Sequence, residues 1–404
     1  MNQHRMTRMR LWVYLIAFTV TLSSLVFSQS GPYREYRFLF GQPYELDPIA
    51  TAGTSLNKVF QDMYYRGIGP RLPERLQPIA ETVWAVYWTY IFSLWPHEFG
   101  HWARARQVGG DFIIHGFSFP FPKAEMDLPA SLSVEEETLA SIGGHEINNL
   151  MMRQTHLDFY QHHYAYADEL IHAFIQEVYF TFYAFVIAPA NPEEPSTWTS
   201  TVGDPVESAL SVYENYTSRP AIRQDGSVDP ELSSYYQEAV YLSVLWIMLD
   251  PMLYQSAKAF GADMEQNHGL LTPRMFGDEI KAWIWGTQFN PSPLGYELYL
   301  TNYLRFNRRL YALYIKAGRP YRNTGIGIQV PGLVEQGKFT LGAACDLWDQ
   351  DMYGRGAAIA FDVKYQFYKG FGLLLKGGWK DEGYLLGKRI DKSATFFVGV
   401  SYQR

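Results

Sequence analysis

The chain of 404 residues contains a single cysteine, Cys345, so no disulfide bond can form within it. Its fold must therefore be held by side-chain packing and by any metal that it binds. Basic residues are also limited: 34 Lys and Arg stand against 41 Asp and Glu, the formal net charge is −7, and no cluster of Lys and Arg forms a stripe. Because nucleic-acid-binding domains need such a basic surface, this composition argues against a nucleic-acid partner.

Long hydrophobic runs are scarce as well. The mean hydropathy is −0.19, which is low for an enzyme with several membrane-spanning helices. One run lies at the N-terminus, where Arg5, Arg8 and Arg10 precede the uncharged apolar segment 11–27. This order is typical of a secretory signal peptide, which we predict over residues 1–28, with an uncleaved anchor as the alternative. Export would place the protein in a bacterial-type cell envelope, either in the periplasm or at the outer membrane.

A second run covers residues 79–95, with Glu81 as its single charged residue. Its length is at the lower limit for crossing a bilayer. Pro96 follows directly, and because proline is favoured in the first turn of a helix, we expect a new helix to begin there.

That expected helix would carry His97-Glu98-Phe99-Gly100-His101, the most informative stretch of the chain. Residues four apart on a helix share one face, so the two imidazoles can bind one metal ion. Zinc suits imidazole ligands, and the glutamate between them can take a proton from a bound water. We predict His97 and His101 as zinc ligands and Glu98 as the general base of a hydrolytic reaction. The alternative is a chance match on a helix rich in His and Glu.

The residues that follow the motif narrow its class. Arg104 and Gln107 stand where metzincins have a glycine and a third histidine, which excludes that class. The motif is followed by an Ala/Arg turn, by glycines at the end of segment 102–110 and by Phe-Ser-Phe at 117–119. This order resembles the site-2 protease family of membrane-embedded zinc proteases, and the resemblance covers residues 92–120.

Two weaker similarities to the same family occur further along the chain. Segment 143–148, Gly-Gly-His-Glu-Ile-Asn, is similar to the family's glycine-containing helix that ends in asparagine. Segment 249–251 resembles its Leu-Asp-Gly element, with Pro251 in the place of the glycine. The resemblance implies that Asp250 is the third zinc ligand.

Two neighbouring residues remain alternatives to Asp250 as the third ligand. Glu146 is one, because many zincins take a glutamate from a second helix, and Gly143-Gly144 would permit a close approach of that helix. His145 is the other.

The segment before about residue 290 has a helical pattern. Ser133 and Glu136 form the sequence of a capping box, which predicts the start of a helix that carries Gly143. Apolar stretches at 170–188 and 239–260 indicate further helices. Segment 190–233 is rich in Pro, Ser and Asp and lacks periodicity, so we expect an exposed lid or loop.

The C-terminal part changes to a period of two. Large apolar residues alternate with small or polar ones in about seven segments, and 33–40 offers a further strand. Segments of this kind resemble outer-membrane β-barrel strands, and the aromatic content of 17% agrees with rings at a membrane interface. A soluble antiparallel sheet packed on the helical domain, with an aromatic-rich core, is the alternative.

The sequence therefore predicts an α+β protein with a helical zincin-like domain at 31–290 and an antiparallel β-sheet or small β-barrel at 291–404. The predicted function is that of an exported, membrane-associated zinc metallopeptidase acting on a peptide or protein substrate. The alternative is a non-enzymatic outer-membrane barrel or structural protein with a vestigial or chance H-E-x-x-H. The oligomeric state is left open.

Overall fold

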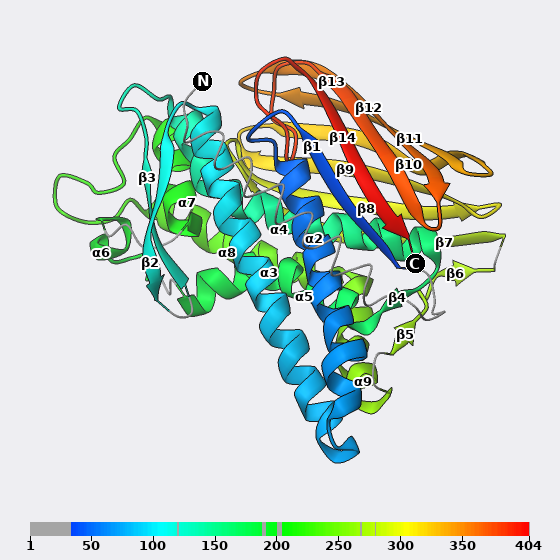
Figure 1. Cartoon of the computed structure of the whole chain (residues 1–404). Coiled ribbons are helices and arrows are strands. Elements are labelled where there is room, and N and C mark those ends of the chain that lie inside the picture. The colour runs from blue at the N-terminus through cyan, green and yellow to red at the C-terminus, as the bar shows by residue number, and fades with distance from the viewer. Residues whose placement is uncertain are drawn as a thin grey trace, which may run out of the picture.

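The computed structural model combines a group of helices with one large curved sheet that packs against them (Figure 1). The expected signal peptide, 1–28, lies outside the described residues. The structure describes residues 34–118, 121–187, 191–199, 204–266, 269–278 and 280–403.

The sheet has ten strands in the order β1-β14-β13-β12-β11-β10-β9-β8-β7-β6, and every neighbouring pair is antiparallel. Within the described residues, β1 and β6 are therefore its two edges. The strands are β1 (Glu35–Gly41), β6 (Phe276–Gly277), β7 (Lys281–Ser292), β8 (Gly295–Phe306), β9 (Arg309–Pro320), β10 (Asn323–Gln336), β11 (Phe339–Gln350), β12 (Gly354–Tyr368), β13 (Phe371–Lys380) and β14 (Ser393–Gln403).

The combination of helices with an antiparallel sheet confirms the α+β prediction at that level. The seven expected strands correspond to β8–β14, and β1 adds the strand expected near residue 33. Strand β7 was not expected, and the predicted boundary at 290/291 falls inside it. The second half of β7 is buried on both faces, which removes the alternation by which a half-buried strand is recognised.

Most helices gather on one side of the sheet, where α2 and α3 run side by side (Figure 1). Residues 46–76 are largely helical, because α2 and shorter helical turns follow one another there. The α-helices are α2 (Leu46–Met63), α3 (Gln77–Gln107), α4 (Val134–His162), α5 (Ala167–Phe182), α6 (Pro195–Thr199), α7 (Asp204–Thr217), α8 (Pro230–Leu249) and α9 (Pro251–Gln266). A hairpin of β2 (Asp111–Ser118) and β3 (Phe121–Asp127) follows α3, and β4 (Ala165–Tyr166) pairs with β5 (Leu270–Leu271).

Helix α3 runs without a break through Pro96, so the prediction that a new helix begins there is wrong. A proline inside a helix leaves the carbonyl four residues earlier without its main-chain partner. Here that residue is Phe92, and its main chain forms a hydrogen bond with the buried imidazole of His172 on α5. Gly53 of α2 leaves room for the proline ring, because a Cβ there would overlap it. Among the described helices, none combines the length and apolarity needed to span a bilayer.

Helix α4 lies between α3 and the sheet. It begins with the predicted capping box of Ser133 and Glu136, which is confirmed. Toward the sheet, Tyr160 packs on Tyr303 of β8 and Asn149 donates to Asn290 of β7. Toward α3, the same helix carries the residues that build the candidate site.

The segment 190–233 is not the aperiodic lid that its composition predicted. It contains α6 and α7, and α7 packs on α8 in a shared core. The apolar stretch 239–260 belongs to two helices, because α8 ends at Leu249 and α9 begins at Pro251.

Candidate metal centre

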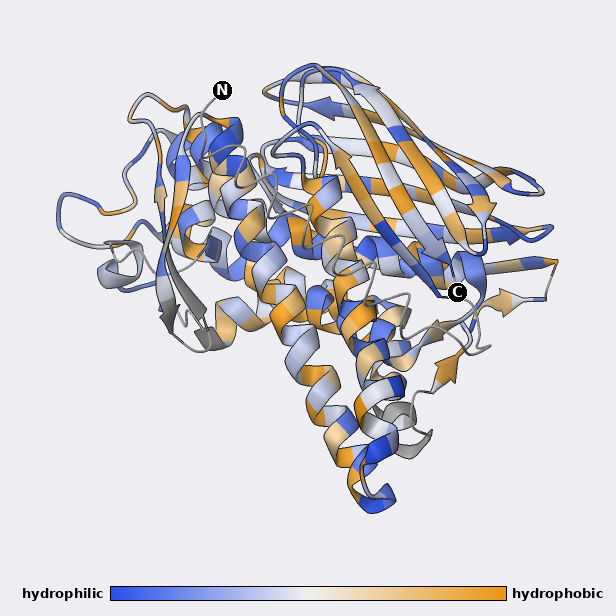
Figure 2. Ribbon diagram, in the orientation of Figure 1, coloured by the Kyte–Doolittle hydropathy of each residue, from blue (hydrophilic) through white to orange (hydrophobic). Residues whose placement is uncertain are grey.

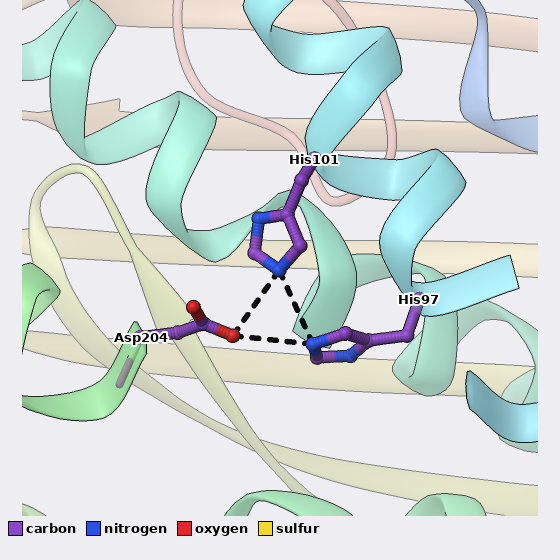
Figure 3. Close-up of side chains that lie close together, drawn as sticks. All are labelled: His97, His101 and Asp204. Atoms are coloured by element: carbon purple, nitrogen blue, oxygen red, sulfur yellow. Dashed lines mark hydrogen bonds and ion pairs between the residues drawn. The ribbon is translucent and has the colours of Figure 1, made fainter. Parts of the chain in front are cut away.

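Two imidazoles and one carboxylate meet where α3, α4 and α7 come together (Figure 3). His97 and His101 are one turn apart on α3, and their Nε2 atoms are 3.2 Å apart. Asp204, the first residue of α7, places its Oδ2 atom 3.1 Å from the Nε2 of each histidine. The two histidines are buried and the Asp204 side chain is 17% exposed, so the group is screened from bulk water but can still be reached.

The other ring nitrogen of each histidine is held by an oxygen acceptor. His97 Nδ1 is 2.6 Å from Asn148 Oδ1, and His101 Nδ1 is 2.9 Å from the carbonyl oxygen of Ala140. In a neutral imidazole, Nδ1 must carry the proton to donate to these oxygens, so Nε2 has a free lone pair. In its neutral form each imidazole therefore presents Nε2 to a metal ion, with the outer hydrogen bond usual for metal-binding histidines.

A chain of buried hydrogen bonds fixes the orientation of Asn148. Its amide nitrogen donates to Gln176 of α5, whose own amide nitrogen donates to Ser93. The Ser93 hydroxyl in turn donates to the carbonyl oxygen of Thr89, at 2.6 Å. In this series of hydrogen bonds each side chain donates to the next one away from His97. The amide nitrogen of Asn148 is therefore used by Gln176, and its oxygen faces His97.

Glycines bring α4 close enough for these contacts. A Cβ on Gly100 would overlap the main chain of Gly143, and the reverse also holds. A Cβ on Gly144 would lie 2.5 Å from the Nε2 atoms of His97 and His101. The Gly143-Gly144 pair therefore permits the helix contact, as the sequence suggested, and leaves the space in front of the imidazoles open.

Asp204 is the residue that the sequence analysis missed. It begins α7 directly before Pro205, a residue favoured at the start of a helix. Apolar residues then recur at helical spacing and bury one face of α7 against α8: Val206, Ala209, Leu210 and Tyr213. The sequence therefore did contain a signal for this helix: an aspartate, then a proline, then apolar residues at helical spacing. It was missed because the surrounding segment is rich in polar residues and was interpreted as a loop.

The geometry of the three atoms fits a metal ion. Zinc binds nitrogen and oxygen ligands at about 2.0–2.2 Å, so the edges of a tetrahedral site measure about 3.3–3.5 Å. The three edges here are 3.1, 3.1 and 3.2 Å. His97, His101 and Asp204 are therefore a group that could hold a metal ion. Three protein ligands leave a fourth position for water or substrate.

Without a bound cation, attraction between the Asp204 carboxylate and the two imidazoles holds the three side chains together. Burial opposes the charged form of His101, but the charge and hydrogen bond of Asp204 outweigh it and raise the pKa of His101 to about 9. Burial also opposes the charge of Asp204, yet the two histidines hold its pKa well below the ordinary range. The site thus stabilises a positive charge beside a carboxylate, the role that a metal ion would take.

Glu98 lies between the two histidines in sequence and is half-buried. Burial raises its pKa above the ordinary value, the two histidines lower it, and Asp204 raises it further. Burial raises the pKa of Tyr90 and of Tyr179, and the negative charge of Glu98 raises both further. These mutual shifts indicate that Glu98 shares the environment of the metal group.

Aromatic rings enclose one side of the centre. The ring of Tyr179 lies 4.8 Å from that of His97, and Tyr183 stacks on His97 at 6.5 Å. His145 lies behind them on α4, with its Nε2 atom 3.8 Å from Asp204 Oδ2. Neither ring nitrogen of His145 has a hydrogen-bond partner within the described residues, and burial lowers its pKa well below the ordinary value. His145 is therefore a buried neutral imidazole beside the group of His97, His101 and Asp204.

The structure does not bring Asp250 to the two histidines. Its carboxylate accepts hydrogen bonds from the main-chain nitrogens of Met252, at 2.7 Å, and Thr287, at 2.8 Å. It thereby caps the start of α9 and attaches it to β7. Among the described residues, the carboxylate beside the histidines is Asp204, not Asp250.

Glu146 is also occupied elsewhere. Its carboxylate accepts from Arg104 at 2.6 and 2.7 Å, from the Tyr384 hydroxyl at 3.0 Å and from the Gly387 main chain at 3.1 Å. These bonds satisfy a buried carboxylate and attach α4 to the loop before β14, so Glu146 has a structural role.

Comparison with known proteins adds no identity to this geometry: no family model, no curated protein sequence and no solved structure matches the chain.

Proposed function

We propose that the protein is a zinc metallopeptidase that hydrolyses peptide bonds. The observation that carries the proposal is the group of His97, His101 and Asp204, in which two imidazole nitrogens and one carboxylate oxygen lie 3.1–3.2 Å apart, slightly closer than the edges of a tetrahedral zinc site. Zinc is favoured because two nitrogens and one oxygen are its common ligands in hydrolases, whereas Mg²⁺ and Ca²⁺ prefer oxygen.

The choice of peptide as substrate rests on the sequence. The H-E-x-x-H pattern is most often found in peptidases, and residues 92–120 resemble the site-2 proteases. The third ligand that this resemblance implied was Asp250, and Asp204 now takes its place in the proposal. The basic start and apolar segment 11–27 support export, so the reaction would take place in the cell envelope.

In this reaction the residues around the metal group would hold the metal ligands, accept a proton and exclude water. Asn148 and Ala140 hold the two imidazoles with their Nε2 lone pairs directed inward. A bound zinc ion would supply Lewis acidity and lower the pKa of a coordinated water. Glu98 would accept the proton of that water, and its raised pKa brings its proton affinity closer to the value that suits a general base near neutral pH. The rings of Tyr179 and Tyr183, which pack against His97, would limit the entry of other water.

The test compares the zinc content and peptidase activity of purified protein with those of three variants, using an unstructured protein such as casein as substrate. We expect Asp204→Asn to lose zinc, because two imidazoles alone leave too few ligands. Glu98→Gln should keep zinc and lose about 10²–10⁴ in rate, because glutamine cannot accept the proton. Asp250→Asn is the matched control and should keep both zinc and activity.

Stoichiometric zinc in Asp204→Asn would contradict the ligand assignment. Undiminished cleavage by Glu98→Gln would contradict the mechanism. If the parent protein neither holds zinc nor cleaves any substrate, the non-enzymatic alternative becomes the better account.

A further inference from the structure

In strands β10–β14 most inward positions carry polar or small side chains and most outward positions carry large apolar ones, the reverse of a sheet in a water-soluble protein. On the face toward α4, Glu297 is fully buried and accepts hydrogen bonds from Lys316 and Asn323. Gln350 donates to Asn323 at 3.0 Å and continues this network into β11. Further toward β14, the inner face lines a cavity of about 270 Å³ with charged side chains: Asp346, Asp362, Lys364 and Lys376.

The outer face of β9–β14 is apolar and exposed. Antiparallel register joins its side chains into continuous rows: Ile326 lies between Ile315 and Leu347, and Ile359 lies between Cys345 and Trp379. Directly opposed residues project from the same face, so these rows form one surface. Figure 2 shows the alternation of hydrophobic and hydrophilic residues along the strands. The large exposed members are Ile315, Ile326, Leu347, Ile359, Phe361, Phe396 and Val398, each between 41% and 56% exposed.

Charged residues on this outer face stand at the strand ends. Arg309 and Arg319 are the outer charged residues of β9, and Asp349 and Arg355 flank the hairpin between β11 and β12. Between these ends, the outward positions of the described strands β9–β14 hold no charged residue. Soluble monomers rarely leave a continuous apolar surface of this extent in water.

One margin of the surface is aromatic. Tyr365 and Phe367 near the end of β12 and Phe339 at the start of β11 are exposed there, and Lys338 and Lys369 lie just beyond them in the turns. From the centre to this margin, the surface thus changes from Ile, Leu, Val and Phe to Tyr and Phe, and then to Lys. A lipid bilayer changes in the same order, from hydrocarbon through the interface to the headgroups.

We propose that the outer face of β9–β14 lies against the hydrocarbon of a lipid bilayer, with α4 enclosed on the polar side of the sheet. The length of these strands, 10 to 15 residues, agrees with the roughly 9–11 residues that a tilted strand needs to cross the hydrocarbon layer. A second copy of the chain would also cover apolar surface, but contact between copies does not require aromatic and charged margins in this order. The proposal uses no residue of the metal centre, so it stands or falls independently of the peptidase function.

The single cysteine of the chain provides the test, because Cys345 shares the outer face with Ile328 and Ile359 near the middle of β11. The full-length protein is labelled there with an environment-sensitive fluorophore and reconstituted into phosphatidylcholine vesicles. We expect nitroxide groups placed deep in the acyl chains to remove most of the fluorescence, and aqueous iodide to have little effect.

The matched control moves the cysteine to the neighbouring turn with the pair of substitutions Cys345→Ser and Lys338→Cys. There the label should be quenched by iodide and by headgroup nitroxide, but not by nitroxide deep in the acyl chains.

Three outcomes would overturn the proposal. The first is recovery of the protein in the aqueous fraction after vesicle flotation. The second is quenching of the Cys345 label by iodide and not by acyl-chain nitroxide. The third is a label shielded from both quenchers while energy transfer reports contact between labelled copies. The last result would assign the face to self-association.

Discussion

His101 is the residue whose protonation controls the filling of the metal centre. Its pKa of about 9 without a metal means that Nε2 carries a proton at neutral pH. A metal ion needs the lone pair of that nitrogen and must displace the proton. Asp204 therefore acts in two ways, as a ligand of the metal and as the group that favours the competing proton.

We predict that the apparent affinity for zinc rises about tenfold per pH unit between pH 6 and 8, and levels off near pH 9. Below the pKa of His101, each binding event releases about one proton, which explains the direction of the change. Isothermal titration calorimetry in buffers of different ionisation enthalpy measures both the affinity and the proton release. Affinity that does not change with pH over this range would show that His101 is not protonated in the empty site.

The raised pKa of His101 also makes the stability of the metal-free protein depend on pH. Because the pKa of His101 is raised above 6.5, the stability that it contributes is complete below pH 6.5 and is lost as the pH rises through about 9.

Helix α3 is the element on which the centre depends, since it carries His97 and His101 and continues as one helix through Pro96. The hydrogen bond from His172 to the Phe92 main chain compensates for the bond that the proline cannot make. A helix-breaking residue is therefore tolerated because a side chain from α5 satisfies the freed carbonyl.

We predict that His172→Leu lowers the free energy of unfolding by about 1–3 kcal/mol, the usual result of leaving a buried polar group without its partner. In a Pro96→Ala background the loss should be smaller, because the alanine N–H can bond to Phe92. Urea unfolding of the four proteins in this double-mutant cycle measures the difference. Equal losses in both backgrounds would contradict this account of α3.

At the scale of the whole molecule, the metal centre joins helices that are distant in sequence, whereas the sheet is held by its own ladders of hydrogen bonds. Asp204 lies 107 residues after His97. Loss of the metal should therefore loosen α7 relative to α3 and leave β8–β14 unaffected.

We predict that chelation of zinc increases hydrogen exchange in α7 and in the adjoining turns of α3, while exchange in β8–β14 stays the same. The metal stabilises only the folded form, by about 4 kcal/mol when its concentration is 1,000 times the dissociation constant. Hydrogen exchange followed by mass spectrometry, with and without chelator, makes the comparison, and Asp204→Asn should behave like the chelated protein. A uniform increase over the whole chain would show that the centre stabilises more than this local junction.

The local features of the fold could be read from the sequence because they depend on near neighbours. The spacing of His97 and His101 places both on one face of any helix, and Ser133 with Glu136 marks a helix start through bonds within one turn. The alternation in β8–β14 likewise follows from the two faces of a strand. These predictions needed no knowledge of what packs against each element.

The third carboxylate could be assigned only from the tertiary structure. Asp204 and Asp250 each precede a proline at the start of a helix, so their local sequences do not distinguish them. What separates them is packing: α7 is held by its apolar face on α8 beside the histidines, whereas the carboxylate of Asp250 is bound to main-chain nitrogens at β7. A metal site assembled from residues about 100 positions apart depends on how whole helices pack, and periodicity along the chain carries no record of that packing.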